Sequence, residues 1–351
     1  MDVLRRPEIF AVLARALRER EVRRLVLLGD SLELRHGPAR EAVAAAEPVL
    51  RELGGAVEDL VLVPGNHDHA LLGPWLERRR EAEPPPLTLE QNVEWEPGEP
   101  GEPLGRLARA AQPAAFSVAY PGLWLRHDVF ATHGHYLDVH LTVPTFERLG
   151  VGVMGRLTGP MPARATPEDY ERHLEPLYAW LGAIAEHAPE GRRAGSSGAS
   201  VRAWRALSGS GGHRVVRVFA MRAAATVALR AANRAGLGPL QTDVAKLDLR
   251  RASLASMGDV VTRLGIEADH VLFGHTHRSG PWPHNDAAEW RTPGGARLWN
   301  TGCWVFERHY VSRTPGESPF WPGVAIELDA EGPPRLTRLL GYRGAAELAP
   351  S

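Results

Sequence analysis

The sequence predicts an α/β fold, and two observations support this class. Short runs rich in Val, Leu and Ile recur along the chain, and each ends in a cluster of Gly, His, Asp or Asn. Such runs are typical of buried strands. Between the first two runs, residues 41–53 are rich in Ala, Glu and Leu and precede Gly54 and Gly55, which predicts a helix and its end. Strand, helix and strand together imply a right-handed crossover and a parallel pair.

The remaining elements follow in order along the chain. A helix is expected over residues 5–21. Strands are expected over residues 25–28, 60–63, 115–120, 123–126, 129–132, 271–273, 297–300 and 323–328. Two polar segments rich in Gly, Pro or Ser, residues 84–103 and 191–212, are expected to be loops.

The middle of the chain has a different pattern, because helical stretches rich in Arg and Ala replace the strand-like runs. Apolar residues from Tyr170 to Ile184 lie three and four positions apart, which predicts an amphipathic helix, and a second such stretch covers residues 215–235. We therefore predict a catalytic core in two parts, residues 1–139 and 265–351, with a helical insertion, residues 140–264, forming a cap.

The second helical stretch alternates apolar residues with arginines, which stand at Arg214, Arg217, Arg222, Arg230 and Arg234. One interpretation is a packed helix with a solvated basic face. The other is an interfacial or lid helix that handles an acyl-bearing or anionic substrate.

Composition excludes several classes of protein. With 41 basic and 42 acidic residues the net charge is −1, which argues against a dedicated nucleic-acid binder. The single cysteine, Cys303, excludes a disulfide framework. No apolar run approaches the roughly 18 to 20 residues of a bilayer-spanning helix, and no secretory leader is evident. We expect a protein of the cytoplasm, with peripheral membrane contact through the cap as an option. The oligomeric state stays open.

Polar side chains at the ends of the predicted strands carry the chemistry. They are Asp30, Asn66, His67, His133, His275 and His277. The carboxyl ends of strands in an open α/β sheet line one crevice, so these residues have a reason to converge. His275 and His277 are alternate residues leaving a strand and can reach one centre. Carboxylate, amide and imidazole ligands together suit Mn, Fe, Zn, Co or Ni. Two such ions can activate water and clamp a phosphoryl group.

Each motif alone is weak, because a Gly-Asp pair after a strand is usually a turn and a lone histidine is usually a packed one. Together they stand in the order Gly29-Asp30, Gly65-Asn66-His67-Asp68, His133-Gly134-His135 and Gly274-His275-Thr276-His277. This series resembles the calcineurin-like metallophosphoesterase family. The resemblance covers the predicted core. It implies a four-layer α/β/β/α sandwich and hydrolysis of a phosphomonoester, phosphodiester or pyrophosphate by a metal-bound hydroxide.

The resemblance also implies a role for each residue. Asp30 would bridge two divalent ions, with Asn66, His133 and His275 on the second ion and His277 on the first. Asp30 and Asn66 would thereby act in catalysis together with His67, which would stabilise the transition state or protonate the leaving oxygen. Asp68 would orient its neighbours. His135 would lie behind the ligands or contact substrate.

One departure from the family matters. The family begins with an Asp-x-His motif on a first strand, and nothing of this kind precedes Asp30. Either the start was assigned too late, or the first metal has lost two ligands and the protein is a catalytically impaired scaffold. Residues 29–34 and the pair His133-Gly134 are loosely similar to UDP-2,3-diacylglucosamine pyrophosphatases, which carry a helical cap over a lipid-bearing substrate. His135 stands where that branch often has aspartate, so a small phosphorylated or lipid-linked substrate is all we expect.

Overall fold

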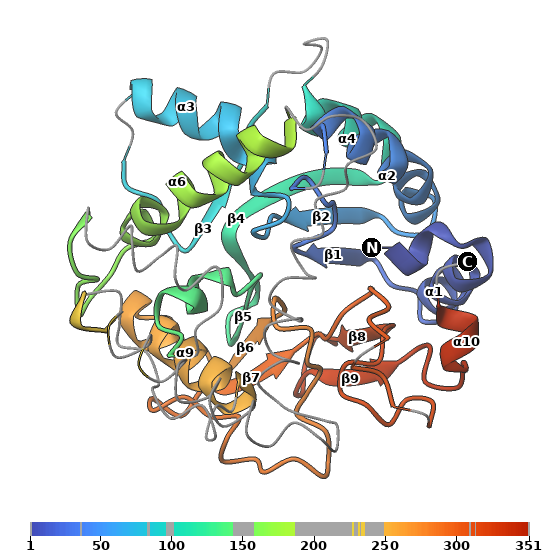
Figure 1. Cartoon of the computed structure of the whole chain (residues 1–351). Helices are drawn as coiled ribbons and strands as arrows, with labels where there is room; N and C mark the ends of the chain where they lie inside the picture. The colour runs from blue at the N-terminus through green and yellow to red at the C-terminus, as the bar shows by residue number, and fades with distance from the viewer. Residues whose placement is uncertain are drawn as a thin grey trace.

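The chain forms a mixed α/β fold in which a curled, mostly parallel sheet is flanked by helices (Figure 1). This finding confirms the predicted α/β class. The computed structural model describes residues 2–35, 37–82, 85–95, 102–142, 158–186, 227, 231, 233–235, 249–308, 310–312 and 314–349.

The main sheet has the strand order β1-β2-β4-β5-β6-β7. The strands are β1 (Arg24–Leu28), β2 (Asp59–Val63), β4 (Ala115–Arg126), β5 (Val129–Thr132), β6 (His270–Phe273) and β7 (Arg297–Asn300). Neighbours pair in parallel except for β4 and β5, which form an antiparallel pair. The parallel pairing of β1 and β2 across helix α2 (Ala39–Gly54) confirms the predicted crossover.

Strand β4 joins the two halves of the sheet. Its first half pairs with β2 and its second half with β5, so the chain changes partner near Pro121 and Gly122. We predicted two strands separated at this Pro-Gly pair, whereas the structure has one strand of 12 residues. A Cβ at Gly122 would lie 2.5 Å from the Ala131 carbonyl oxygen and 2.5 Å from the Phe130 ring. Glycine therefore allows β5 to approach β4 closely at this position.

A third strand lies inside a segment that we expected to be a loop. β3 (Glu90–Asn92) pairs antiparallel with β4. Its three residues are Glu, Gln and Asn, and none is buried, so no apolar alternation announced a strand. A separate hairpin consists of β8 (Val324–Glu327) and β9 (Arg335–Arg338).

Helices cover the sheet. They are η1 (Asp2–Arg5), α1 (Pro7–Glu19), α2, η2 (His69–Leu72), α3 (Gly73–Ala82), α4 (Pro103–Ala110), η3 (His135–Val139), α6 (Pro167–Glu186), α9 (Leu249–Leu264) and α10 (Ala345–Leu348). No described helix combines the length and apolar character needed to span a bilayer.

The described part of the predicted insertion is helical and packs on the core. Tyr170 and Leu174 of α6 share a buried cluster with Met257 and Val260 of α9, and this cluster also contains Phe273 of β6. Helix α9 therefore contributes to the core as well as to the insertion. The segment 191–212 and most of the stretch 215–235 lie outside the described residues, as do Arg214, Arg217, Arg222 and Arg230, so the predictions made for them stay predictions.

Candidate metal centre

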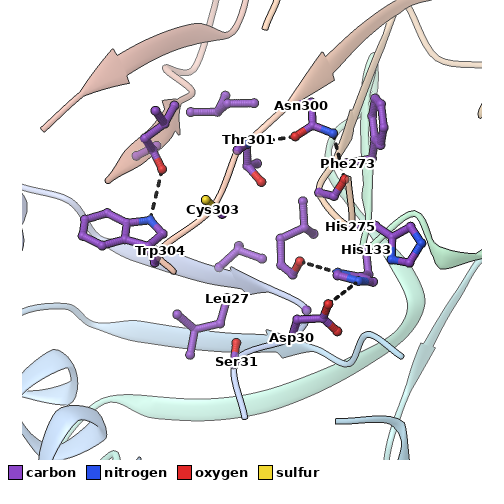
Figure 2. A pocket seen from close by; sticks show the side chains of 18 of the residues that line it. Leu27, Asp30, Ser31, His133, Phe273, His275, Asn300, Thr301, Cys303 and Trp304 are labelled. Atoms are coloured by element: carbon purple, nitrogen blue, oxygen red, sulfur yellow. Dashed lines mark hydrogen bonds and ion pairs between the residues drawn. The ribbon is translucent and has the colours of Figure 1, made fainter. Parts of the chain in front are cut away.

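Four loops carry the candidate ligands, and each follows a strand of the main sheet. Asp30 follows β1, Asn66 follows β2, His133 follows β5 and His275 follows β6. Figure 2 shows that the side chains of Asp30, His133 and His275 lie at one end of a pocket between these strands. The sheet therefore gathers residues separated by more than 200 positions.

The ligand atoms of three of these residues are close enough to hold one metal ion. Atoms of Asp30, His133 and His275 all lie within 4.8 Å of one another. Asp30 Oδ2 lies 3.2 Å from His133 Nε2. The Asn66 side-chain oxygen lies 3.3 Å from His133 Nε2 and 3.2 Å from His275 Nδ1. Two oxygens and two imidazole nitrogens thus converge, a donor set that suits a borderline divalent ion.

Hydrogen bonds behind the two histidines orient them toward this point. The Nδ1 atom of His133 lies 2.9 Å from the Leu28 carbonyl oxygen, so it donates a proton there and Nε2 presents its lone pair to the cluster. The Nε2 atom of His275 lies 3.0 Å from an oxygen of buried Asp138, which leaves Nδ1 as the ligand atom. Outer partners of this kind fix the tautomer and ring direction of metal-binding histidines.

The backbone at the site adopts a conformation that side chains rarely allow. Asp30, His275 and His277 have φ values of 50°, 60° and 59°. Non-glycine residues in this left-handed region cost about 1–3 kcal/mol and concentrate at functional sites. Among the described residues only Glu21 shares this feature. The surrounding structure therefore stabilises a strained backbone that sets the direction of these side chains.

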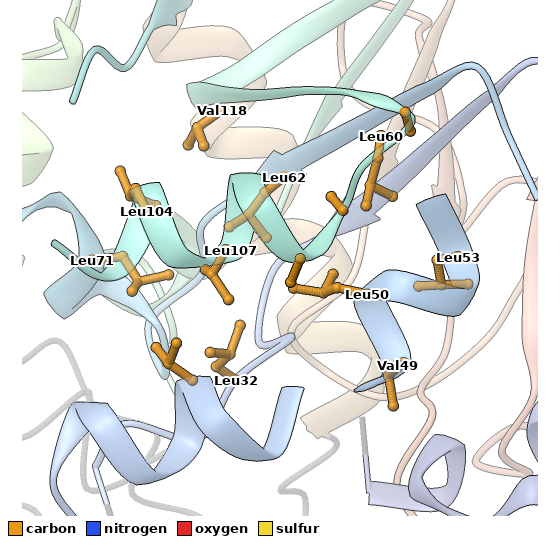
Figure 3. Close-up of a cluster of buried hydrophobic side chains, with 14 of the residues drawn as sticks. Leu32, Val49, Leu50, Leu53, Leu60, Leu62, Leu71, Leu104, Leu107 and Val118 are labelled. Carbon is orange, nitrogen blue, oxygen red and sulfur yellow. The ribbon is translucent and has the colours of Figure 1, made fainter. Parts of the chain in front are cut away.

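A buried aspartate ties two of the loops together. Asp68 Oδ1 accepts a hydrogen bond from the Gly65 amide at 2.5 Å, and Asp68 Oδ2 accepts one from the Ser31 amide at 2.8 Å. Leu32, the next residue along, lies in a buried cluster with Leu50 and Leu107 (Figure 3). Asp68 thus anchors the Asp30 loop and the Asn66 loop to the same core, as expected of an orienting residue.

Glycine at position 65 is required by the close approach of the ligands. A Cβ there would lie 2.5 Å from Asp30 Oδ1 and 2.6 Å from the His133 ring. We expect Gly65→Ala to displace both ligands, to weaken metal binding and to lower the free energy of unfolding by about 1–3 kcal/mol, the usual cost of overpacking. Thermal unfolding and a Co²⁺ titration measure the two effects.

Gly73→Ala is the matched control for this substitution. Nothing lies within 4 Å of a Cβ at Gly73, and this residue begins helix α3, where alanine is favourable. Its metal affinity should equal that of the parent protein. An unchanged affinity in Gly65→Ala would show that the Asn66 loop does not approach the ligands as described.

Charge is concentrated at the centre. Burial alone would raise the pKa of Asp30, but the adjacent His133 and His67 outweigh it and hold that pKa well below its usual value. Burial alone would lower the pKa of His133, yet Asp30 raises it. Burial and the charge of Asp30 raise the pKa of Asp68. Asp30 is therefore a carboxylate at neutral pH and can act as a ligand.

His67 lies beside the cluster rather than in it. Its Nε2 is 3.8 Å from Asp30 Oδ2, its Nδ1 is 2.5 Å from Glu33 Oε2, and its ring contacts the Arg35 guanidinium. Burial would lower the pKa of His67, but Asp30 and Glu33 raise it. The His67 side chain is 27% exposed and lines the pocket. It therefore faces the pocket beside the candidate ligands.

Two other predicted residues lie outside the cluster. His277 is 29% exposed, and its Nδ1 lies 3.6 Å from Glu307 Oε2. His135 is fully buried, and its ring centre is 5.6 Å from that of His133. Burial and the charge of His133 hold the pKa of His135 well below its usual value, so this imidazole is neutral. His135 packs behind a ligand.

Three residues near the site were not among our sequence-based candidates. Asp138 supports His275, and Glu33 and Arg35 contact His67. Cys303 is buried at the pocket, and burial raises the pKa of its thiol to about 12, so it is a thiol and not a thiolate at neutral pH.

An open cavity of about 2010 Å³ extends from the centre along β1. All of β1 and all of β8 line it, together with Asp30, His133 and His275. Among the described residues, β1 pairs only with β2, and β8 only with β9. The four apolar residues 25–28 of β1 are only half-buried, whereas residues 60–63 of β2 are buried. The cavity therefore connects an unpaired strand edge to the ligands.

Comparison with known proteins adds no family to this picture. No protein-family description, curated protein or solved structure matches the chain.

Proposed function

We propose that this protein is a metal-dependent phosphoesterase of the calcineurin-like type. The observation that carries the proposal is the convergence of Asp30, Asn66, His133 and His275 from four strand ends. The order of the motifs along the chain supports it. In this proposal the curled sheet corresponds to the two inner layers of an α/β/β/α sandwich, and β4 is the strand that passes between them.

The donor set fits a divalent ion, and these four residues would hold it. When bound, divalent ions supply positive charge against the phosphoryl oxygens and acidity to a bound water. The protein contributes the orientation. Leu28 and Asp138 fix the two imidazoles, and Asp68 fixes the loops, so the ligands need little rearrangement.

His67 would act on the substrate itself. Glu33 holds its Nδ1, and its Nε2 lies between Asp30 and the Arg35 guanidinium. With Arg35 turned from Nε2 to the substrate, His67 would donate a hydrogen bond to the phosphoryl group or a proton to the leaving oxygen. Arg35, in contact with the ring, would add positive charge where an anionic substrate enters.

A second ion would need more ligands than the described cluster supplies. The family resemblance implies two of them, from an Asp-x-His motif on a first strand. The open cavity beside β1 leaves room for further ligands near Asp30. His277, now beside Glu307, would turn toward that ion. The same open cavity would accept a phosphorylated or lipid-linked substrate.

Removal and return of metal test the proposal. Protein treated with a chelator should not hydrolyse a chromogenic phosphodiester, and Mn²⁺ should restore the activity. Metal analysis of the protein should find a bound divalent ion. Hydrolysis that survives complete metal removal would contradict the proposal. A bound ion without hydrolysis would favour the catalytically impaired scaffold.

A further inference from the structure

A second group of polar side chains is buried beside the candidate metal centre and takes no part in the proposed reaction. It consists of His69, Tyr120, Tyr136 and Glu171, each at most 5% exposed. Glu171 comes from helix α6, whereas the others come from η2, β4 and η3. A buried carboxylate is destabilising unless it is hydrogen-bonded.

Glu171 accepts three hydrogen bonds, which satisfy it. Its Oε1 atom accepts from the Tyr120 hydroxyl at 2.5 Å and from the Tyr136 hydroxyl at 2.6 Å. Its Oε2 atom lies 3.0 Å from His69 Nε2. Burial alone would raise the pKa of Glu171, but these three bonds outweigh it and lower that pKa. The carboxylate is therefore a fixed point to which three core elements are tied.

Tyr170, the residue before Glu171 in α6, contacts the short helix η3. The rings of Tyr170 and Tyr136 stack with centres 4.5 Å apart and planes 5° apart. The Tyr170 hydroxyl lies 2.8 Å from Nε2 of His140, just past the end of η3. Tyr170 and Glu171 thus clamp η3 at Tyr136 and at His140.

Asp138 lies between these two clamped positions. It is buried, and its carboxylate bonds His275 Nε2 at 3.0 Å, which orients the ligand atom of His275. A shift of η3 would move Asp138 and with it the direction of His275. Loss of such an outer partner typically lowers metal affinity 10- to 100-fold.

We propose that Glu171 is a positioning residue for the metal centre: it ties helix α6 to η3 and so holds Asp138 against His275. The inference rests on the proposed metal site. It adds that α6, a helix of the predicted insertion, sets the metal affinity of that site. Movement of α6 would then change metal affinity without any contact between α6 and the ion.

The substitution series separates shape from charge. Glu171→Ala removes all three bonds. Glu171→Gln keeps an oxygen for both tyrosines, and its amide can donate to His69 Nε2 if that ring takes the other tautomer. Tyr136→Phe removes only the hydrogen bond between Tyr136 of η3 and Glu171. Because this change is smaller, it tests the inference even if the Glu171→Ala protein does not fold. Glu175→Ala is the matched control, since Glu175 lies on the same helix and pairs with Arg80 at the surface.

Co²⁺ binding to the full chain, followed by its visible absorption, is the measurement. Glu171→Ala and Tyr136→Phe should lower Co²⁺ affinity about 10-fold and shift the absorption bands, as the loss of an outer partner does. Glu171→Gln should restore parent affinity, and Glu175→Ala should match the parent. Asp138→Asn with Glu171→Ala should be no weaker than Asp138→Asn alone, because both act through His275.

The outcomes distinguish this inference from the proposed function. If Asp138→Asn weakens Co²⁺ binding and Tyr136→Phe and Glu171→Ala do not, the role of Glu171 is refuted and the metal site stands. Additive losses in the double variant would also refute it. If the parent protein binds no Co²⁺, both proposals are refuted.

Discussion

Asp30→Asn should abolish metal binding and phosphodiester hydrolysis while leaving the protein folded. The asparagine oxygen can still accept the hydrogen bond that Asp30 Oδ1 receives from the His67 amide at 2.9 Å. Its amide nitrogen, however, replaces Oδ2, the atom that faces His133 Nε2 at 3.2 Å. A charged ligand thus becomes a neutral donor that cannot bind a cation. The loss of affinity should exceed the roughly 10- to 100-fold cost of losing an outer partner.

Calorimetric titration with Mn²⁺ and the hydrolysis rate measure this effect. Asp59→Asn is the control, since Asp59 is on β2 at the start of the strand and pairs with Arg24 at 3.5 Å, away from the ligands. Asp59→Asn should match the parent protein in both assays. Full Mn²⁺ affinity in Asp30→Asn would place the ion elsewhere.

His67→Gln should separate catalysis from metal binding. His67 lies outside the ligand cluster, so Mn²⁺ affinity should remain that of the parent protein. The catalytic rate should fall about 10²- to 10⁴-fold, the usual contribution of a positioned proton donor. Steady-state kinetics at saturating Mn²⁺ measure kcat and KM separately, and the decrease should appear in kcat.

His127→Gln provides the comparison, because the His127 side chain is 91% exposed. It should leave kcat and KM unchanged. If His67→Gln lost Mn²⁺ in parallel with activity, His67 would be a ligand and not a group that acts on the substrate. An unchanged kcat would remove His67 from the mechanism.

The sequence predicted the sheet wherever an apolar run ended in a polar cluster. Strands β1, β2, β5 and β6 were found in this way, and the same rule pointed to the four candidate ligands that follow them. This rule failed where a strand forms because of the strand it pairs with and not because of its own composition. β4 continues through Pro121 and Gly122 because it exchanges β2 for β5 there, and β3 exists because β4 offers it an edge.

The candidate centre was predictable in part for a related reason. Residue spacing suggested that His275 and His277 reach one point, which assumes extended backbone. Both residues instead have positive φ, and His277 lies beside Glu307. Asp138 and Glu171 could not be predicted, because their sequence context is that of ordinary helical segments. The partner of Asp138 is 137 positions away and those of Glu171 are 35 to 102 positions away, and only the folded chain brings them together.

The most direct test of the account is anomalous diffraction from crystals soaked in Mn²⁺. We predict a peak within direct coordination distance of Asp30 Oδ2, Asn66 Oδ1, His133 Nε2 and His275 Nδ1. Mn²⁺ bound in the crystal at any other place, with these four atoms free of it, would contradict the central claim.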